Sequence, residues 1–397
     1  MKALFVNVSS VGHVVPTLSL VAALVRRGVA AVYLEIEQHR EELEACGARF
    51  RPLALPAQGY DGPQGAQLPT LPAVLAHCAI DWTGTVAEII REEKPDIVVH
   101  DSLCLWGRLA ADMTGVPRVA SIASAAISRR MLTNDPLVAA WRAAAGDPAA
   151  FEEHFARSWD RISARYGCPA QDMVASTLNT APCNIVHLSR SLQPHEGDFG
   201  PDYLFCGAGE PTRHLQHSFD WASLSDRRVV LMSFGTAHDP GREFYVNVAR
   251  AMRHVDATLV VIDSPSMHPN AIEWPEGTVV CANGSAPQIK LLERADLFIS
   301  HVAGGAVREA AWMATPILGL PQTFEQDLFC HHLSAHGFAM RLSDRPGVEE
   351  IASRINDMLT NKTLRARAQA LSDLQRSAPP ADGLAAEAII GQMTACA

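Results

Sequence analysis

The sequence alternates two kinds of segment over most of its length. Short apolar runs of strand length are followed by longer stretches in which apolar residues recur at helical spacing. This alternation predicts βαβ units, in which crossover helices cover both faces of a parallel sheet. It occurs twice, on either side of a polar segment at 206–226. We therefore expect an α/β protein of two doubly wound domains joined by a linker at 206–226.

The first domain is expected over 1–205. Its predicted strands lie at 3–8, 29–34, 49–55, 95–101, 117–122 and 184–189, and its predicted helices at 17–27, 39–46, 71–92 and 103–114. Residues 129–180 carry aromatic side chains at helical spacing and no clear strand. We expect a helical insertion there, over one end of the sheet.

The second domain is expected over 227–378. After a strand in "RVVLMSFGT" at 228–236, strands are predicted at 257–263, 278–281, 296–300 and 316–320, with helices at 242–254, 286–293, 305–313 and 326–336. A last helix within 379–397 is expected to cross back to the first domain. Neither G-x-G-x-x-G after the first strand nor G-x-x-x-x-G-K-[ST] occurs, which argues against dinucleotide and P-loop sites.

Composition and charge limit the classes of partner that we expect. The formal net charge of the 397 residues is -10, and no block of Lys and Arg stands out, so nucleic acid is not expected as a partner. The N-terminus does not resemble a signal peptide, and no stretch of roughly 20 apolar residues suggests a membrane span. The nine scattered cysteines include no C-x-x-C pair and indicate reduced thiols in a cytoplasmic protein. Oligomeric state stays open, with a homodimer as one alternative.

Two residues of the first domain suggest acid–base chemistry. His13 lies in a polar loop after the first strand, before Pro16, which is typical of a helix start. Asp101 ends the strand at 95–101. Carboxyl ends of neighbouring parallel strands meet at one edge of a sheet, where a carboxylate can orient an imidazole that accepts a proton near neutral pH. The alternative interpretation is that Asp101 caps a helix.

An anion site is predicted in the second domain. A buried strand ends at Ser300, His301 follows, and Gly304 and Gly305 precede a helix that contains Glu309. Unpaired amides and the dipole of a helix N-terminus attract a diphosphate, and glycine allows close approach to the backbone. Alternatively, His301 packs beneath the next helix.

The motifs together resemble one family. They are "GHVVPTL" near the N-terminus, "VVHDSLCLWG" at 98–107, "SFGT" at 233–236, "SAPQIKLLERADLFISH" at 285–301 and "PQTFEQ" at 321–326. In this order and spacing the chain resembles the UDP-glycosyltransferase superfamily over nearly its whole length, particularly bacterial macrolide and natural-product glycosyltransferases. The resemblance implies a GT-B fold, with two Rossmann-like domains facing across a cleft.

The resemblance also implies residue roles. His13 matches the base that deprotonates the acceptor hydroxyl, and Asp101 matches the acid that orients it. The positions that match donor contacts are Thr236 near the phosphates, Gln288 and Glu309 on the nucleotide, His301 with Gly304 and Gly305 on the diphosphate, and Glu325 with Gln326 on the sugar hydroxyls. Alternatively, Thr236 is a turn residue, and Glu325 and Gln326 form a solvated helix start.

Two departures from the family pattern concern the donor. Val302, Ala303 and Ala306 stand where the family offers glycine and the hydrogen-bonding side chains of Asn, Ser or Thr. Ser285 stands where a tryptophan that stacks on the base is frequent, and stacking of this kind contributes ~1–3 kcal/mol. The base preference is therefore open between a uridine and a thymidine donor.

We expect an inverting hexosyltransferase that uses a nucleotide-sugar such as UDP-glucose or a TDP-deoxysugar as co-substrate. The expected acceptor is a small hydrophobic natural product such as a macrolide or polyketide of antibiotic biosynthesis, bound by the loops at 55–80 and 125–175. No cofactor or metal is expected, because no D-x-D follows a strand and no third ligand accompanies His332 and His336, or His214 and His217. The alternatives are an auxiliary GT-B protein that activates a partner glycosyltransferase, and an epimerase or glycan-carrier transferase of the same architecture.

Overall fold

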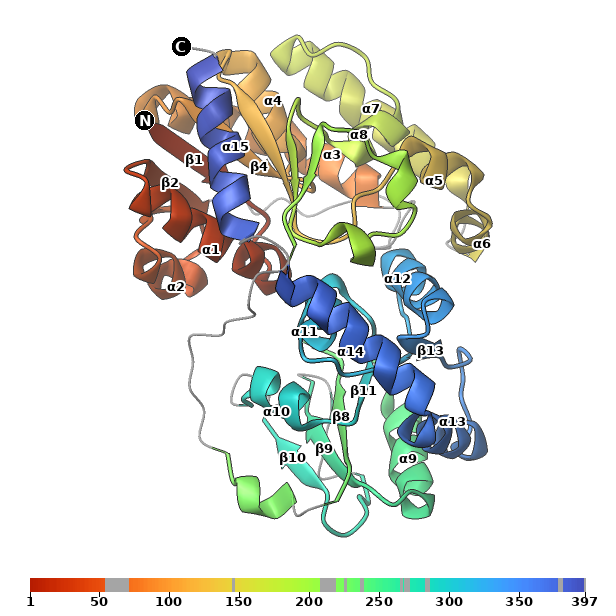
Figure 1. Ribbon diagram of the computed structural model, residues 1–397. Coiled ribbons are helices and arrows are strands. Elements are labelled where there is room, and N and C mark those ends of the chain that lie inside the picture. Colours follow the sequence, from red (N-terminus) through yellow and green to blue (C-terminus); the bar gives the residue numbers. More distant parts are fainter. Residues whose placement is uncertain are drawn as a thin grey trace. The chain divides into compact units, whose positions relative to one another are not determined.

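The computed structural model (Figure 1) describes residues 1–53, 71–144, 147–207, 219–224, 227–235, 239–264, 267, 272–282, 286–377 and 381–395. The chain divides into two compact units. Unit 1 comprises Met1–Gly207 and Pro379–Ala397, and unit 2 comprises Ala208–Ala378. Most of the predicted linker at 206–226 lies outside the described residues.

Unit 1 is built on a parallel sheet of seven strands in the order β3-β2-β1-β4-β5-β6-β7. The strands are β1 (Lys2–Val6), β2 (Ala30–Glu35), β3 (Arg49–Pro52), β4 (Ile97–Asp101), β5 (Arg118–Ile122), β6 (Asn184–Val186) and β7 (Tyr203–Phe205). The order reverses between β1 and β4, which is therefore the topological switch point of this sheet.

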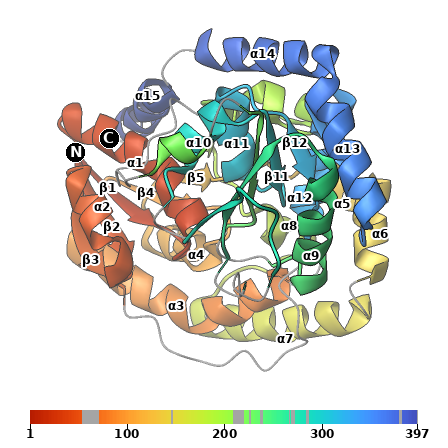
Figure 2. The same ribbon diagram turned by 90° about the horizontal axis from the view of Figure 1, so that it is seen from below.

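Helices cover both faces of this sheet (Figure 2). They are α1 (Val11–Arg26), α2 (Arg40–Ala45), α3 (Leu71–Glu93), α4 (Leu105–Thr114), α5 (Arg129–Asn134), α6 (Pro136–Ala144), α7 (Pro148–Tyr166), α8 (Met173–Leu178) and α15 (Ala381–Ala395). Alternate residues of β1 face opposite ways. Ala3 and Phe5 pack with residues of α1 and α15, whereas Leu4 and Val6 pack with residues of α3, α4 and α7. The last helix of the chain thus completes the core of unit 1.

Helix α1 begins earlier than the sequence predicted. It starts at Val11 and includes Pro16, so His13 lies in the first helical turn and not in a loop. The apolar period extends back to Val14, which is fully buried and in phase with Leu18. Pro16 removes only one backbone hydrogen-bond donor from the helix. The burial of Val14 therefore outweighs the destabilising effect of this proline.

Among the described helices, α3 is long and apolar enough to be a candidate membrane span by length and composition alone. Half of its apolar window is buried inside the protein, and the helix packs against α4 and α7. Core helices of globular proteins can have the same apolar composition.

Unit 2 contains a second parallel sheet, in the order β10-β9-β8-β11-β12-β13. Its strands are β8 (Val229–Ser233), β9 (Thr258–Ile262), β10 (Val279–Cys281), β11 (Leu297–Ser300), β12 (Ile317–Gly319) and β13 (Ala339–Arg341). The order reverses between β8 and β11. Unit 2 therefore repeats the doubly wound plan of unit 1.

The helices of unit 2 complete the α/β layers. They are α9 (Arg242–Ala251), α10 (Gln288–Arg294), α11 (Gly304–Trp312), α12 (Phe324–Ala335), α13 (Val348–Thr360) and α14 (Lys362–Ser377). Residues of α9 and α13 pack on one face of the sheet in a single buried cluster. Helix α11 contacts α10, α12 and α14. Short 3₁₀ helices in the chain span Glu37–His39, Arg190–Leu192, Glu196–Asp198, Trp221–Leu224 and Met252–His254.

Sequence and structure agree on most elements, with differences at the edges. The insertion at 129–180 is helical, as expected, and its described part divides into α5, α6, α7 and α8. The strands β7 and β13 and the helices α13 and α14 were not predicted. Strand β7 directly precedes the polar segment at 206–226, and the other three elements follow residue 336, where the predicted elements of the second domain ended. The eight described cysteines are free thiols.

Close packing at Gly319 generates a stability prediction. A Cβ atom there would lie 2.6 Å from Cγ2 of Val302 and 2.7 Å from Sγ of Cys330. We expect Gly319→Ala to lower the free energy of unfolding by about 1–3 kcal/mol, as overpacked cores do. The matched control is Gly391→Ala in α15, where a Cβ meets nothing within 4 Å and the substitution should be neutral or stabilising. Denaturant titration measures both, and equal stability of the two variants would contradict the prediction.

Candidate active site

His13 and Asp101 form a hydrogen-bonded pair in unit 1. Nδ1 of His13 lies 2.7 Å from Oδ2 of Asp101. The histidine side chain is 22% exposed, whereas the aspartate side chain is 0% exposed. A carboxylate that accepts from Nδ1–H leaves Nε2 as the basic ring nitrogen. The pair can therefore take up a proton at Nε2 and hold the resulting imidazolium against a buried negative charge.

The topology of the sheet places the pair. His13 follows β1 and Asp101 ends β4, and these adjacent strands flank the switch point. The second carboxylate oxygen of Asp101 accepts a hydrogen bond from the backbone N–H of Leu103 at 2.7 Å. Nδ2 of Asn179 donates to the backbone carbonyls of Asp101 and Ser102, at 3.3 and 3.0 Å. Hydrogen bonds to both the side chain and the backbone of Asp101 thus fix the position of its carboxylate.

The neighbouring His100 cannot act as a second base. It is fully buried, and burial lowers its pKa to about 3. The side chain stays neutral at working pH and faces α4, where Cβ of His100 would lie 3.0 Å from a Cβ on Gly107. Of these two consecutive residues, only Asp101 lies within hydrogen-bond distance of His13.

In unit 2, His301 lies next to the turn after β8. It directly follows β11, and its Cε1 would lie 3.4 Å from a Cβ on Gly235. The rings of His301 and Phe234 lie 6.1 Å apart. Helix α11 begins at Gly304 without a side-chain cap from Ala303. The structure therefore brings the predicted histidine, the glycine pair and a helix N-terminus to the switch point of the second sheet.

The backbone at Val302 is strained. Its φ is +66°, a left-handed conformation that costs a residue with a Cβ roughly 1–2 kcal/mol. The side chain is fully buried against Gly319. The strain lies beside His301, in the segment that departs from the family pattern. Strained backbone of this kind clusters at functional sites.

Gln288 and Glu309 also meet. Nε2 of Gln288 donates to Oε2 of Glu309 at 2.6 Å, joining the start of α10 to α11. Glu325 lies half-buried in the first turn of α12. Gln326 is buried, and its Oε1 accepts from the backbone N–H of Gln322 at 2.8 Å. This contact restrains the loop that precedes α12.

Two predicted donor residues, Thr236 and Ser285, lie outside the described residues, as do His214 and His217. Within the described ranges no three His, Cys, Asp or Glu side chains gather to hold a metal ion. The rings of His332 and His336 lie 4.5 Å apart, and Nδ1 of His336 bonds the carbonyl of His332 at 2.8 Å.

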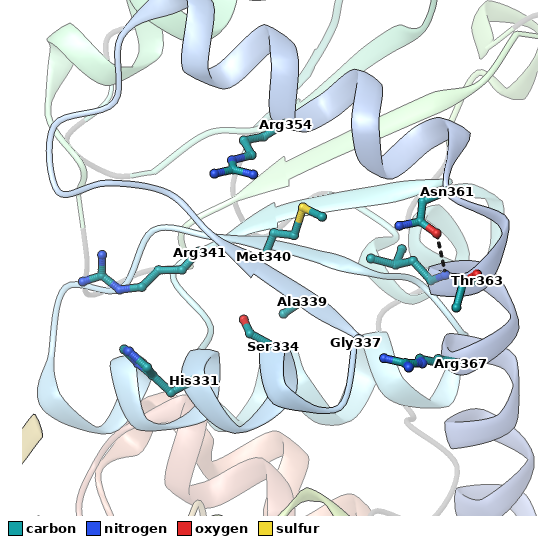
Figure 3. A pocket seen from close by; sticks show the side chains of 11 residues that line it. His331, Ser334, Gly337, Ala339, Met340, Arg341, Arg354, Asn361, Thr363 and Arg367 are labelled. Atoms are coloured by element: carbon teal, nitrogen blue, oxygen red, sulfur yellow. Dashed lines mark hydrogen bonds between the residues drawn. The ribbon is translucent and has the colours of Figure 1, made fainter.

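A pocket of about 380 Å³ lies elsewhere in unit 2 (Figure 3). Residues of α12, β13, α13 and α14 line it, among them Arg341, Arg354 and Arg367. None of the predicted site residues lines this pocket. Arg341 is paired with Asp327 and Asp344. We therefore treat the strand ends at the switch point of each unit, and not this pocket, as the candidate functional residues of that unit.

Known proteins share sequence over most of the chain. The oleandomycin glycosyltransferase of Streptomyces antibioticus is 26% identical over 356 residues, which cover 87% of this chain and 80% of the relative. The uncharacterized UDP-glucosyltransferase YdhE of Bacillus subtilis (strain 168) is 25% identical over 366 residues, 90% of each chain. No protein-family profile matches the chain.

Solved structures share the fold. The glycosyltransferase of kitacinnamycin superposes with a TM-score of 0.82 at 21% identity and covers 99% of both chains. The spinosyn rhamnosyltransferase SpnG, crystallised with thymidine diphosphate, has a TM-score of 0.69 at 19% identity and covers 97% of this chain and 98% of its own.

Fold and sequence together define a glycosyltransferase of the GT-B class. The chain is similar over most of its length to UDP-glycosyltransferases, and the relatives named above include natural-product glycosyltransferases. The resemblance carried by the motifs is thereby confirmed.

Sequence reasoning missed the polar side chains behind the pair. Asn7, Tyr33 and Thr17 lie buried beneath the turn that carries His13, and Glu35 ends the neighbouring strand β2. Two of them carried a signal: Asn7 interrupts the first apolar run, and Glu35 is a charged residue at the end of another. Their contacts depend on strand pairing, which the sequence does not specify.

Glu35 generates a pH prediction. It is fully buried, and burial raises its pKa above the ordinary 4.5, although hydrogen bonds from Ser9 and from the Ile36 N–H oppose this. The native state therefore disfavours the carboxylate, and stability is lost as the pH rises from 4.5 through the raised pKa. We expect Glu35→Gln to raise the thermal midpoint at pH 8 and to lose this advantage towards pH 4.

The control for this prediction is Glu37→Gln. The Glu37 side chain is exposed, and its pKa is lowered by a hydrogen bond with Arg40. Its charge is therefore not disfavoured in the native state, and no gain is expected at any pH. Thermal unfolding of both variants between pH 4 and 8 makes the comparison, and a pH-independent gain for Glu35→Gln would contradict the role of its charge.

Proposed function

We propose that the protein is an inverting, metal-independent glycosyltransferase that moves a hexose from a nucleoside diphosphate to a hydroxyl group of a small hydrophobic natural product. The observation that carries the proposal is the 2.7 Å contact between His13 Nδ1 and Asp101 Oδ2 at the switch point of unit 1. A partly exposed imidazole that is oriented by a buried carboxylate suits general base catalysis on a hydroxyl group.

In the proposed reaction, Nε2 of His13 takes the proton of the acceptor hydroxyl as its oxygen attacks the anomeric carbon. The new glycosidic bond forms on the face opposite the diphosphate. The bond from the anomeric carbon to the diphosphate oxygen breaks, and the nucleoside diphosphate leaves with the electron pair, so configuration inverts. The carboxylate of Asp101 stabilises the imidazolium that results.

Donor binding is proposed for unit 2. His301 and the backbone N–H groups of Gly304 and Gly305 suit the diphosphate, because a helix N-terminus attracts developing negative charge. We propose that the hydrogen-bonded pair of Gln288 and Glu309 holds the nucleoside, with the carboxylate towards the ribose hydroxyls. Glu325 and Gln326 are proposed to bind the sugar hydroxyls, and Thr236 the phosphates. The sequence has no D-x-D after a strand, which supports charge stabilisation without a bridging metal.

The relatives support the proposed classes of donor and acceptor. SpnG was crystallised with thymidine diphosphate and, separately, with spinosyn aglycone, and another relative is an oleandomycin glycosyltransferase. These support a TDP-deoxysugar or UDP-glucose as donor and a macrolide or polyketide as acceptor. Ser285 stands where a tryptophan would stack on the base, so the proposal does not choose between a thymidine and a uridine donor.

The proposed base is tested by His13→Ala. We expect loss of transfer of at least about 100-fold, the range for removal of a general base, with nucleotide affinity unchanged. Transfer to an aglycone panel is followed by mass spectrometry, and nucleotide binding by calorimetry. The same assay in EDTA tests the metal-independent mechanism, and loss of turnover there would contradict it. Wild-type turnover by His13→Ala would remove His13 from the mechanism.

Donor identity is tested by thermal shift. Unfolding of the protein is followed with UDP, TDP, GDP, CDP and their glucose conjugates. The preferred nucleotide should raise the thermal midpoint by linkage, and His301→Ala should abolish the rise. No rise with any nucleotide would contradict donor binding in unit 2. Transfer that appears only when a partner glycosyltransferase is added would instead favour the auxiliary function.

A further inference from the structure

The helical turn that carries His13 is weakly held by its own helix. Ser10, at the N-cap of α1, makes no side-chain capping hydrogen bond. Pro16 has no backbone N–H, so the carbonyl of Gly12 receives no i+4 hydrogen bond. In this first turn the N–H groups of His13 and Val14 share a single acceptor, the carbonyl of Ser10, at 2.9 Å each. A base at such a position needs restraint from elsewhere, because catalysis depends on placement within a fraction of an ångström.

That restraint comes from a buried chain of hydrogen bonds. Nδ2 of Asn7 donates to the backbone carbonyl of His13 at 2.9 Å and to the hydroxyl of Tyr33 at 2.8 Å. The hydroxyls of Tyr33 and Thr17 lie 2.9 Å apart, and Thr17 donates to the carbonyl of Val14 at 2.7 Å. Since the proton of Thr17 is used on Val14, Tyr33 must donate to Thr17 and accept from Asn7. The side chains of Asn7 and Thr17 therefore bind two consecutive backbone carbonyls of the turn, those of His13 and Val14.

Burial makes this network rigid. Tyr33 and Thr17 are fully buried, and Asn7 is 4% exposed. The ring of Tyr33 stacks on Phe5 with centroids 5.2 Å apart and planes 5° from parallel, which fixes its orientation. Burial raises the pKa of Tyr33 well above 10, so its hydroxyl keeps the proton that it donates. In this environment an unpaired polar group is costly, and the network is stable only in its complete form.

We propose that Tyr33, acting with Asn7 and Thr17, is a positioning residue that sets the placement of His13 for proton abstraction. The inference rests on the proposed function and adds to it a group from β2, a strand that carries none of the predicted site residues. Tyr33 is fully buried; its hydroxyl bonds Asn7 and Thr17, and its ring stacks on Phe5. Its effect must therefore pass through the turn. The rate of the chemical step should depend on it, whereas substrate binding should not.

The decisive variant is Tyr33→Phe, which keeps the ring and its stacking on Phe5 and removes only the hydroxyl. We expect kcat for sugar transfer to fall by about 10-fold or more, since small misplacement of a catalytic group has effects of this order. The KM values for donor and acceptor, and the Kd of the nucleoside diphosphate, should stay within about twofold of wild type, because uniform binding is untouched. Thr17→Val removes the next link at nearly constant volume and should act in the same direction.

Tyr203→Phe is the matched control. Tyr203 lies in β7, at the far edge of the same sheet, and takes no part in the network. Its kcat and KM should equal those of wild type. Thermal unfolding of all variants shows whether each is folded at the assay temperature, and Thr17→Val supplies the test if Tyr33→Phe is not.

The outcomes separate this inference from the proposed function. Wild-type kcat in folded Tyr33→Phe and Thr17→Val, together with an inactive His13→Ala, would overturn the positioning role and leave the base in place. A parallel change of kcat and KM that follows the loss of thermal stability would show general destabilisation and also overturn it. Full turnover by His13→Ala would overturn the proposed function, and the positioning role with it. A fall in kcat alone supports the inference.

Discussion

The hydrogen bond between His13 and Asp101 is the interaction on which the chemistry proposed for unit 1 depends. It joins residues 88 positions apart, and it exists because β1 and β4 are neighbours where the strand order reverses. The backbone of each residue is also held by the side-chain amide of a buried asparagine. Asn7 binds the carbonyl of His13, and Asn179 binds the carbonyl of Asp101. The topology of the doubly wound sheet thus brings His13 and Asp101 together at one sheet edge. The buried side-chain amides of Asn7 and Asn179 then fix the positions of the two residues.

Unit 2 repeats this arrangement, with a different task proposed for it. Its strand order reverses between β8 and β11, and His301 and Gly235 meet there. The local cost is visible at Val302, whose left-handed backbone is retained because the buried side chain packs against Gly319. Close packing on a glycine therefore maintains a strained segment beside a candidate anion site.

Much of this arrangement was predictable from particular residues. Apolar runs such as "VVLMS" and "LFIS" identified the buried strands, and the motifs around His13, Asp101 and His301 identified their polar ends. The predicted start of α1 at residue 17 was wrong because Pro16 is typical of a helix start, whereas the burial of Val14 extends the helix back to Val11. The pairing of Gln288 with Glu309 required the packing of α10 against α11, and the network behind His13 required the pairing of β1 with β2.

By itself the sequence determined the α/β class, the repeated strand–helix plan and the positions of the residues proposed to carry chemistry, because periodicity and motif spacing are local properties of the chain. Tertiary structure alone decided which of those residues meet. Strand order, the helical turn that holds His13, and the hydrogen bonds of Asn7 and Tyr33 all depend on contacts between distant segments. Those contacts form only when the apolar faces of strands and helices are buried together, and no local pattern encodes that geometry.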